Sequence, residues 1–364
     1  MILSAKKNKT TTTVGVDIDA DSVAAVQPAQ GSGAPQGAVV PLPAGAYSGG
    51  EIADVDAVAA ALRELFGREK LGKRVRLAVA SQSVAFRSLR LPLIEDPEQL
   101  KAAVRFQAQE QIPMPLESAV LDHQVIGAQV ADDGSRQVDV AVVAARRQSI
   151  DLLLAVARGA GLELVGIDLA AFGMIRALAA TASRPGAELA AAAGPETEEY
   201  VPATLYCGLG GVTNLAIARD YSCLFSRVAE FSARGIAEEL AGTTGLQLEH
   251  AEQWLVHAGL EQPVEEISGD PETVAAARGA LESNLGRLAD ELRLSLDYYG
   301  ALESAVPVGE VVLCGWGSTI PGLPAQLGAV LGREVSVRRP PALAAADDAW
   351  AARLTLPYGL ALER

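Results

Sequence analysis

Cysteines and long apolar runs are scarce in this chain of 364 residues. The three cysteines, Cys207, Cys223 and Cys314, are odd in number and far apart. A disulfide framework needs paired cysteines, so we expect a reducing, cytoplasmic compartment. No run approaches the ~18 apolar residues of a membrane-spanning helix. No apolar segment follows the early lysines, so we expect no secretory signal.

Basic side chains are outnumbered too. Thirty Lys and Arg residues stand against 45 Asp and Glu residues, a formal net charge of −15. Phosphate backbones and anionic lipid heads repel such a chain, which argues against nucleic acid as a partner and against direct membrane insertion. The length exceeds that of one simple hydrophobic core, so two lobes are expected.

Motifs for covalent or metal catalysis are missing as well. The sequence has no Gly-x-Ser-x-Gly elbow and only three histidines. His250 and His257 could share a helix face, but no further ligand completes a metal set. Gly67 to Lys73 has P-loop spacing, yet it precedes a strand and lacks the final Ser or Thr. We therefore expect no catalytic residue and no metal.

Apolar spacing divides the chain into two similar parts. Residues 14–27 and residues 203–219 each read as strand, tight turn, strand, which is a weak internal duplication. Between these parts, residues 180–202 are rich in Ala, Gly, Pro and Glu and lose all periodicity, which is typical of a linker. Further strands are expected at 75–80, 138–143, 311–314 and 335–337. Strand-like segments are expected at 354–357 and 360–362, without a terminal amphipathic helix.

Helices are marked by apolar residues at intervals of three and four. One is expected over residues 54–66 and another, with a leucine stripe, over 281–299. A third helix has clear start and stop signals. Asp96 can cap it, Pro97 suits its first position, and Ile112-Pro113 ends it.

Three turns rich in Gly or Asp each follow a buried strand, at residues 17–19, 208–211 and 315–318. Such turns place backbone N–H groups at a strand end, where they can hold phosphate. Three of them in two duplicated halves are the layout of the actin, Hsp70 and sugar-kinase superfamily. The expected fold is therefore α/β and actin-like, of the ribonuclease H type, with duplicated halves.

Within this layout the chain resembles the PilM family, the actin-like proteins of type IV pilus assembly. The resemblance covers nearly the whole chain. The segments that carry it are 14–18, 86–92, 109–113, 121–125, 140–146, 160–162 with 167–168, 315–323 and 358–362.

The resemblance implies a bilobed fold in which an inserted subdomain 1C replaces the usual 1B. The implied boundaries are 1–74 for the first part of subdomain 1A, 75–162 for 1C, 163–202 for the rest of 1A with the linker, 203–235 for the first part of 2A, 236–306 for 2B, and 307–364 for the rest of 2A.

The resemblance also implies a role. The groove between 1A and 1C would hold the cytoplasmic N-terminus of a PilN-like membrane protein, so the chain would be a cytoplasmic scaffold held near the membrane by its partner. An acidic surface suits a basic juxtamembrane tail. The candidate groove residues are Arg87, Leu89, Leu91, Phe106 and Met114. The sequence leaves open whether a pilus motor ATPase or other platform proteins are further partners, and whether the chain self-associates.

ATP lies between the lobes in some members of the family, but here the pattern departs from theirs. The first loop reads Asp17-Ile18-Asp19-Ala20-Asp21-Ser22, with three carboxylates and no Lys where a polyphosphate would lie. Cys207 stands where the second loop has Asp, and the Ala251-Glu252 motif lacks its Lys. If ATP binding is retained, its residues are Asp17, Asp19, Ser22, Gly210, Gly211, Thr213, Gly235, Gly315, Gly317 and Ser318.

The sequence therefore favours a non-enzymatic adaptor with a degenerate nucleotide cleft and no required cofactor. An active actin-like ATPase using ATP and Mg²⁺ is the first alternative. An FtsA-like division protein is the second, and the absence of an amphipathic C-terminal helix argues against it.

Overall fold

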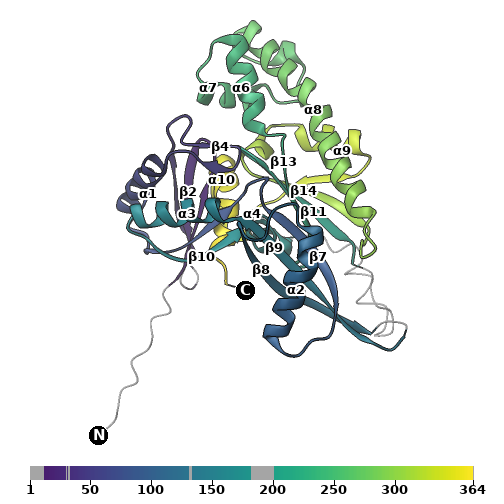
Figure 1. The fold of residues 1–364 in the computed structure, drawn as a ribbon. Coiled ribbons are helices and arrows are strands. Elements are labelled where there is room, and N and C mark those ends of the chain that lie inside the picture. The colour runs from purple at the N-terminus through teal and green to yellow at the C-terminus, as the bar shows by residue number, and fades with distance from the viewer. Residues whose placement is uncertain (1–11, 30, 32, 131–132, 182–200, 364) are drawn as a thin grey trace.

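The computed structural model describes residues 12–29, 31, 33–130, 133–181 and 201–363 (Figure 1). Two five-stranded sheets organise them, in the orders β10-β6-β1-β2-β3 and β13-β12-β11-β14-β15. In the first sheet β1 (Val14–Ile18), β2 (Ser22–Gln27) and β3 (Gln36–Pro41) form an antiparallel meander, and β6 (Arg74–Val79) and β10 (Glu163–Leu169) continue it in parallel.

The second sheet repeats this topology. The strands β11 (Ala203–Leu209), β12 (Thr213–Arg219) and β13 (Ser222–Ala229) form the meander, and β14 (Val308–Cys314) and β15 (Glu334–Val337) are the parallel pair. Sequence had shown only a weak duplication, and the strand order confirms it. Two halves of this topology make the actin-like fold that was expected.

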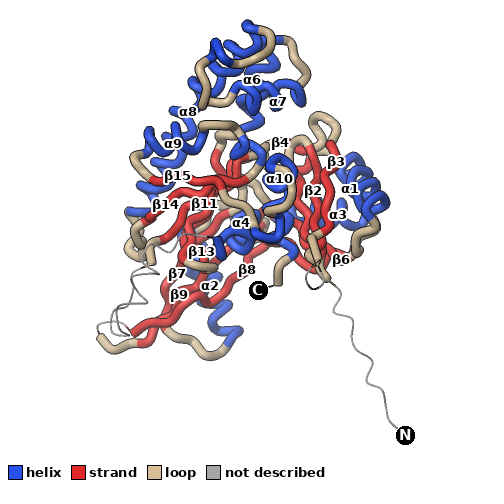
Figure 2. The backbone as a smooth tube through the Cα atoms, turned by 180° about the vertical axis from the view of Figure 1, so that it is seen from behind, coloured by secondary structure: helices blue, strands red, loops and turns tan. Residues whose placement is uncertain are grey.

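Two helices lie between the sheets, as Figure 2 shows. Helix α4 (Ala170–Leu178) follows the last strand of the first sheet and α10 (Asp348–Ala361) follows that of the second. They pack on each other, and α10 also packs on β1 and β2. Helices α1 (Val55–Glu69) and α3 (Arg147–Gly159) pack together on the first half.

The segment expected to be strand-like at the C-terminus is thus helical, and that prediction was wrong. Leu354 and Leu360 are fully buried in α10. Burial against β1 and α4 outweighs the hydrogen bond that Pro357 cannot make inside the helix. Helix α10 falls within the range expected for subdomain 2A, yet it packs on the sheet of the first half; the 2A boundary stays a prediction.

Each half carries its own insertion. In the first half, β7 (Ala85–Pro92), α2 (Pro97–Gln111), β8 (Ala119–Val130) and β9 (Arg136–Arg146) form a small subdomain with strand order β7-β9-β8. This small unit spans residues 85–146. The boundaries expected for 1C, 75 and 162, also take in part of β6, which is central in the first sheet, and α3, which packs on α1; they stay a prediction.

The second half carries helices instead, at the top of Figure 1. They are α6 (Ala233–Thr244), α7 (Leu248–Ala258) and α8 (Pro271–Gly300), and α9 (Leu323–Leu331) joins β14 to β15. The leucine stripe predicted on α8 is confirmed, since Leu281, Leu288 and Leu292 are buried in the core of this half. The linker predicted at 180–202 lies almost entirely outside the described residues.

The crossing of α4 and α10 depends on a close backbone approach at Gly359. A Cβ atom there would lie 1.8 Å from the carbonyl oxygen of Gly173. We expect Gly359→Ala to lower the free energy of unfolding by about 2–3 kcal/mol. Gly242→Ala in α6, where a Cβ meets no atom within 4 Å, should instead raise it by about 0.5–1 kcal/mol. Denaturant unfolding of both variants checks the pair, and similar shifts would contradict the packing argument.

Candidate functional site

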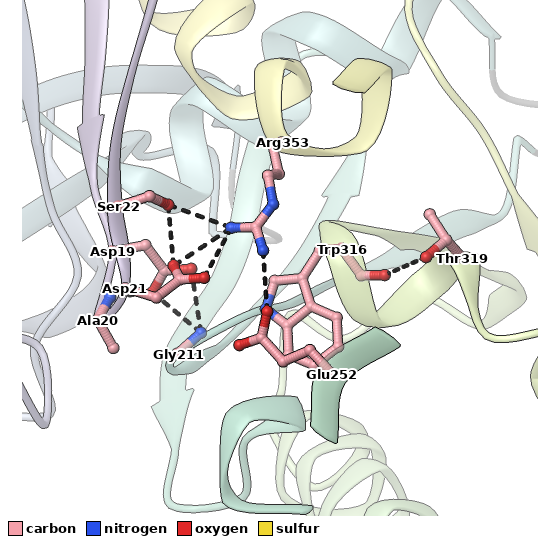
Figure 3. A network of polar contacts seen from close by, with 9 residues as sticks. All are labelled: Asp19, Ala20, Asp21, Ser22, Gly211, Glu252, Trp316, Thr319 and Arg353. Atoms are coloured by element: carbon pink, nitrogen blue, oxygen red, sulfur yellow. Dashed lines mark hydrogen bonds and ion pairs between the residues drawn. The ribbon is translucent and has the colours of Figure 1, made fainter. Parts of the chain in front are cut away.

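Three loops and one helix meet in a cleft between the two halves (Figure 3). The β1–β2 turn comes from the first half. The β11–β12 turn comes from the second half, as does the short 3-10 helix Trp316–Thr319 after β14. Helix α10 covers the cleft and contributes Arg353. The topology therefore brings together loops about two hundred residues apart in sequence.

The first two loops are tied by one carboxylate. Asp19 accepts hydrogen bonds from the backbone N–H of Gly211, at 2.9 and 3.1 Å, and from that of Ala20, at 2.8 Å. A Cβ atom on Gly211 would lie 2.3 Å from an Asp19 oxygen, so only glycine permits this approach. The Gly211 N–H, which the sequence analysis had assigned to phosphate binding, thus donates to Asp19 instead.

Arg353 is the centre of a second set of contacts. Its guanidinium donates to Asp21 at 2.9 Å, to the Ser22 hydroxyl at 3.1 Å and to Glu252 of α7 at 3.1 Å. It also lies 6.0 Å from the centre of the Trp316 ring. One side chain of α10 therefore joins the first-half turn to the helical insertion of the second half.

Acidic groups in this cleft are crowded and poorly solvated. Burial raises the pKa of Asp17 to about 8, and the neighbouring Asp19 adds to the effect. Burial and Asp21 raise the pKa of Asp19 as well. Burial also raises the pKa of Glu252 to about 7, with Asp21 contributing and Arg353 opposing. Burial and mutual repulsion therefore favour the protonated form of Asp17.

The structure brings half of the predicted nucleotide residues to the cleft surface, namely Asp17, Asp19, Ser22, Gly210 and Gly315. Gly211 lies against Asp19. The others serve local structure: the Gly235 N–H is bonded to Ser232 at the start of α6, the Ser318 hydroxyl donates to the Gly315 carbonyl, and Thr213 is fully buried. A Cβ on Gly317 would lie 2.9 Å from Leu209, so this glycine permits loop packing.

Sequence reasoning missed Arg353. No local motif surrounds it, and its partners lie about 100 and 330 residues away. Only the return of α10 to the first half brings it to the cleft.

A groove of about 380 Å³ lies between the inserted subdomain and the first half. Strands β8 and β9 form one wall, and α3, β10 and α4 form the other. The lining residues are Val79, Val120, Asp122, His123, Gln124, Ala141, Val143, Ala145, Ile150, Ile167, Asp168, Leu169 and Phe172.

None of the five predicted groove residues lines this hollow. Leu89 and Leu91 face α2 and are buried in the core of the insertion, 2% and 6% exposed. Met114 packs against the same core. Phe106 is 70% exposed on α2, and Arg87 donates to the carbonyls of Gln111 and Phe86. The reason is the strand order: β7 is the strand farthest from β8 and its groove.

The family model described as type IV pilus assembly protein PilM matches residues 15–355. The chain belongs to the PilM family. A solved chain of a PilM–PilN type IV pilus biogenesis complex is 25% identical, with 96% of this chain and 97% of that chain covered and a TM-score of 0.76. The ethanolamine utilization protein EutJ from Carboxydothermus hydrogenoformans is 16% identical over 96% and 88% of the chains, with a TM-score of 0.52, which shows the fold alone.

The ATP site implied for some PilM proteins does not fit the residues of this cleft. Its cavity is about 60 Å³, against ~300–1,000 Å³ for small-molecule sites. The Gly211 amide is taken by Asp19, and Arg353, the one basic side chain among the described lining residues, is already paired. Within the described ranges, no group of acidic, His or Cys side chains could hold a metal ion.

A final observation concerns the membrane. Among the residues placed in the structure, no helix has the length and apolar content to cross a bilayer.

Proposed function

We propose that this PilM-family protein is a scaffold that binds the cytoplasmic N-terminal peptide of a PilN-like membrane protein, without ATP turnover. Pilus assembly is the role of its family, and the similar solved chain comes from a PilM–PilN complex. The chain would then work at the cytoplasmic face of the membrane, held there by its partner.

The observation that carries the proposal is the groove between the insertion and the first half. It is lined mainly by apolar side chains, and several of them, including Val143, Ile150 and Phe172, are only partly buried. Its two walls also end in sheet edges, because β8 is the last strand of its sheet and β10 the first of the other. An extended peptide can pair with such an edge while apolar pockets receive alternate side chains.

Charge favours a basic peptide. Asp122 is exposed at the groove and has no ion-pair partner among the described residues, whereas Asp168 pairs with Arg176 at 2.5 Å. The net charge of −15 would also attract the basic tail that precedes a transmembrane helix.

The test is binding of a labelled peptide with the N-terminal sequence of the cognate PilN, measured by fluorescence anisotropy. Val120→Glu places a charge in the apolar groove wall, and we expect it to weaken binding at least about tenfold. Val125→Glu is the matched control: it lies on the same strand, is 45% exposed and does not line the groove. We expect unchanged affinity for the control.

Two outcomes count against the proposal. One is no binding by the unaltered protein at tens of micromolar peptide. The other is equal weakening by Val120→Glu and Val125→Glu, which would place the peptide elsewhere.

The alternative of a nucleotide-regulated ATPase makes a different prediction. It requires the unaltered protein to bind Mg-ATP, whereas Asp19 already accepts from the Gly211 amide and Arg353 is already paired with Asp21 and Glu252. Calorimetry that gave submicromolar Mg-ATP binding would favour this alternative.

A further inference from the structure

We infer that the backbone N–H groups of Ala20 and Gly211 form an anion site, called the cradle below, and that the Asp19 side chain fills it. The Asp19 carboxylate therefore competes with any polyphosphate for these donors. The inference rests on the proposed function only where that function concerns the nucleotide cleft. It does not depend on the peptide groove, because peptide binding is measured in a separate experiment.

Two backbone donors converge on the Asp19 carboxylate. The N–H groups of Ala20 and Gly211 come from turns at the ends of two strands, and both point at the Asp19 carboxylate at 2.8–3.1 Å. Backbone N–H groups that converge on one point favour an anion there. Here the anion is a side chain of the protein itself, held across the boundary between the two halves.

The β1–β2 and β11–β12 turns lie very close together. Cβ atoms on Gly210 and Gly211 would lie 2.6 and 2.3 Å from Asp19 oxygens, and one on Gly211 would lie 2.5 Å from the Ala20 Cβ. The turns are therefore in van der Waals contact, with no space between them for a phosphate group. A phosphate could reach the Gly211 amide only if the Asp19 carboxylate left it.

A cation lies in the same cleft. Arg353 is paired with Asp21 and Glu252 on one side of the same cleft. If a shorter residue replaced Asp19, the N–H groups of Ala20 and Gly211 and the Arg353 guanidinium would face one space. Such a combination of backbone N–H groups and an arginine suits a phosphate chain. The ligand class is therefore an inorganic triphosphate or the triphosphate of a nucleotide.

The experiment compares the unaltered protein with Asp19→Gly and Asp19→Asn by calorimetry, using inorganic triphosphate and Mg-ATP in parallel. Removal of a carboxylate charge at contact distance from the anion should tighten binding of both ligands at least about tenfold in Asp19→Gly. Asp19→Asn keeps the shape and one acceptor but not the charge, so it should show a smaller gain in the same direction. Each ligand should also raise the melting temperature of the variants but not that of the unaltered protein.

Controls separate a site from a general charge effect. Asp139→Asn removes one carboxylate from an exposed pair with Arg90, outside the cleft, and should leave triphosphate binding unchanged. Addition of Arg353→Met to Asp19→Asn should reverse the gain. If Asp19→Gly proves unfolded by circular dichroism, Asp19→Asn decides.

The inference is overturned if the folded variants bind triphosphate no better than the unaltered protein, or if Asp139→Asn gains equally. Gain for Mg-ATP without gain for inorganic triphosphate would also overturn it, because the cradle would then not be the site. Peptide binding by Asp19→Asn should match that of the unaltered protein.

Discussion

Replacement of Arg353 by Met is expected to lower the free energy of unfolding by about 3–5 kcal/mol, because it leaves two partly buried carboxylates without their cation. Asp21 and Glu252 keep only 22% and 11% of their side-chain surface exposed. Methionine preserves most of the apolar stem, so the loss measures the charge and its hydrogen bonds. Urea unfolding near neutral pH gives the value.

A control variant and a second background test this prediction further. Arg339→Met removes a pair with Asp348, which is 75% exposed, and should cost far less, because water and salt screen exposed pairs. In a Glu252→Gln background, Arg353→Met should cost at least about 1 kcal/mol less than it does alone, because one of the stranded charges is already gone. An equal cost in both backgrounds would show that Glu252 and Arg353 are not coupled.

The place of Arg353 in the cleft could not be predicted from the sequence alone. Local signals were sufficient for local structure: Asp96 accepts from the Gln99 N–H at 2.8 Å, Pro97 begins α2, and Ile112 ends it, all as predicted. The two hairpins and the α8 stripe were likewise visible, because turn chemistry and apolar periodicity act within a few residues. The family resemblance supplied the pairing of the two halves, which no short segment could.

What the sequence did not predict depends on long-range packing. The C-terminal segment looked like strands because Leu354, Leu356 and Leu360 were read without their environment, which is β1 and α4 on several sides. Leu89 and Leu91 were chosen because they lie on an element that flanks the expected groove, yet the sequence does not say which face of a sheet a helix covers. Here α2 covers their face, and the groove lies two strands away, beside β8.

Asp17→Asn is expected to make the protein more stable in mildly alkaline solution, by up to several kcal/mol. Burial, reinforced by Asp19 and Asp21, raises the pKa of Asp17 from 3.8 to about 8. Between these two values the folded protein holds a proton that the unfolded chain releases, so stability falls as pH rises. The stabilising contribution is fully present below about pH 4 and is lost as pH passes about 8.

Asparagine cannot ionise, so the variant should escape this loss. We expect its free energy of unfolding to equal that of the unaltered protein near about pH 4 and to exceed it increasingly toward about pH 8. Subtraction of the two pH profiles removes the titration of distant groups. Asp151→Asn, which removes a carboxylate from an exposed site on α3 outside the cleft, is the matched control. A flat difference for Asp17→Asn would mean that Asp17 ionises normally, and that the cleft is wetter and more open than its closed loops imply.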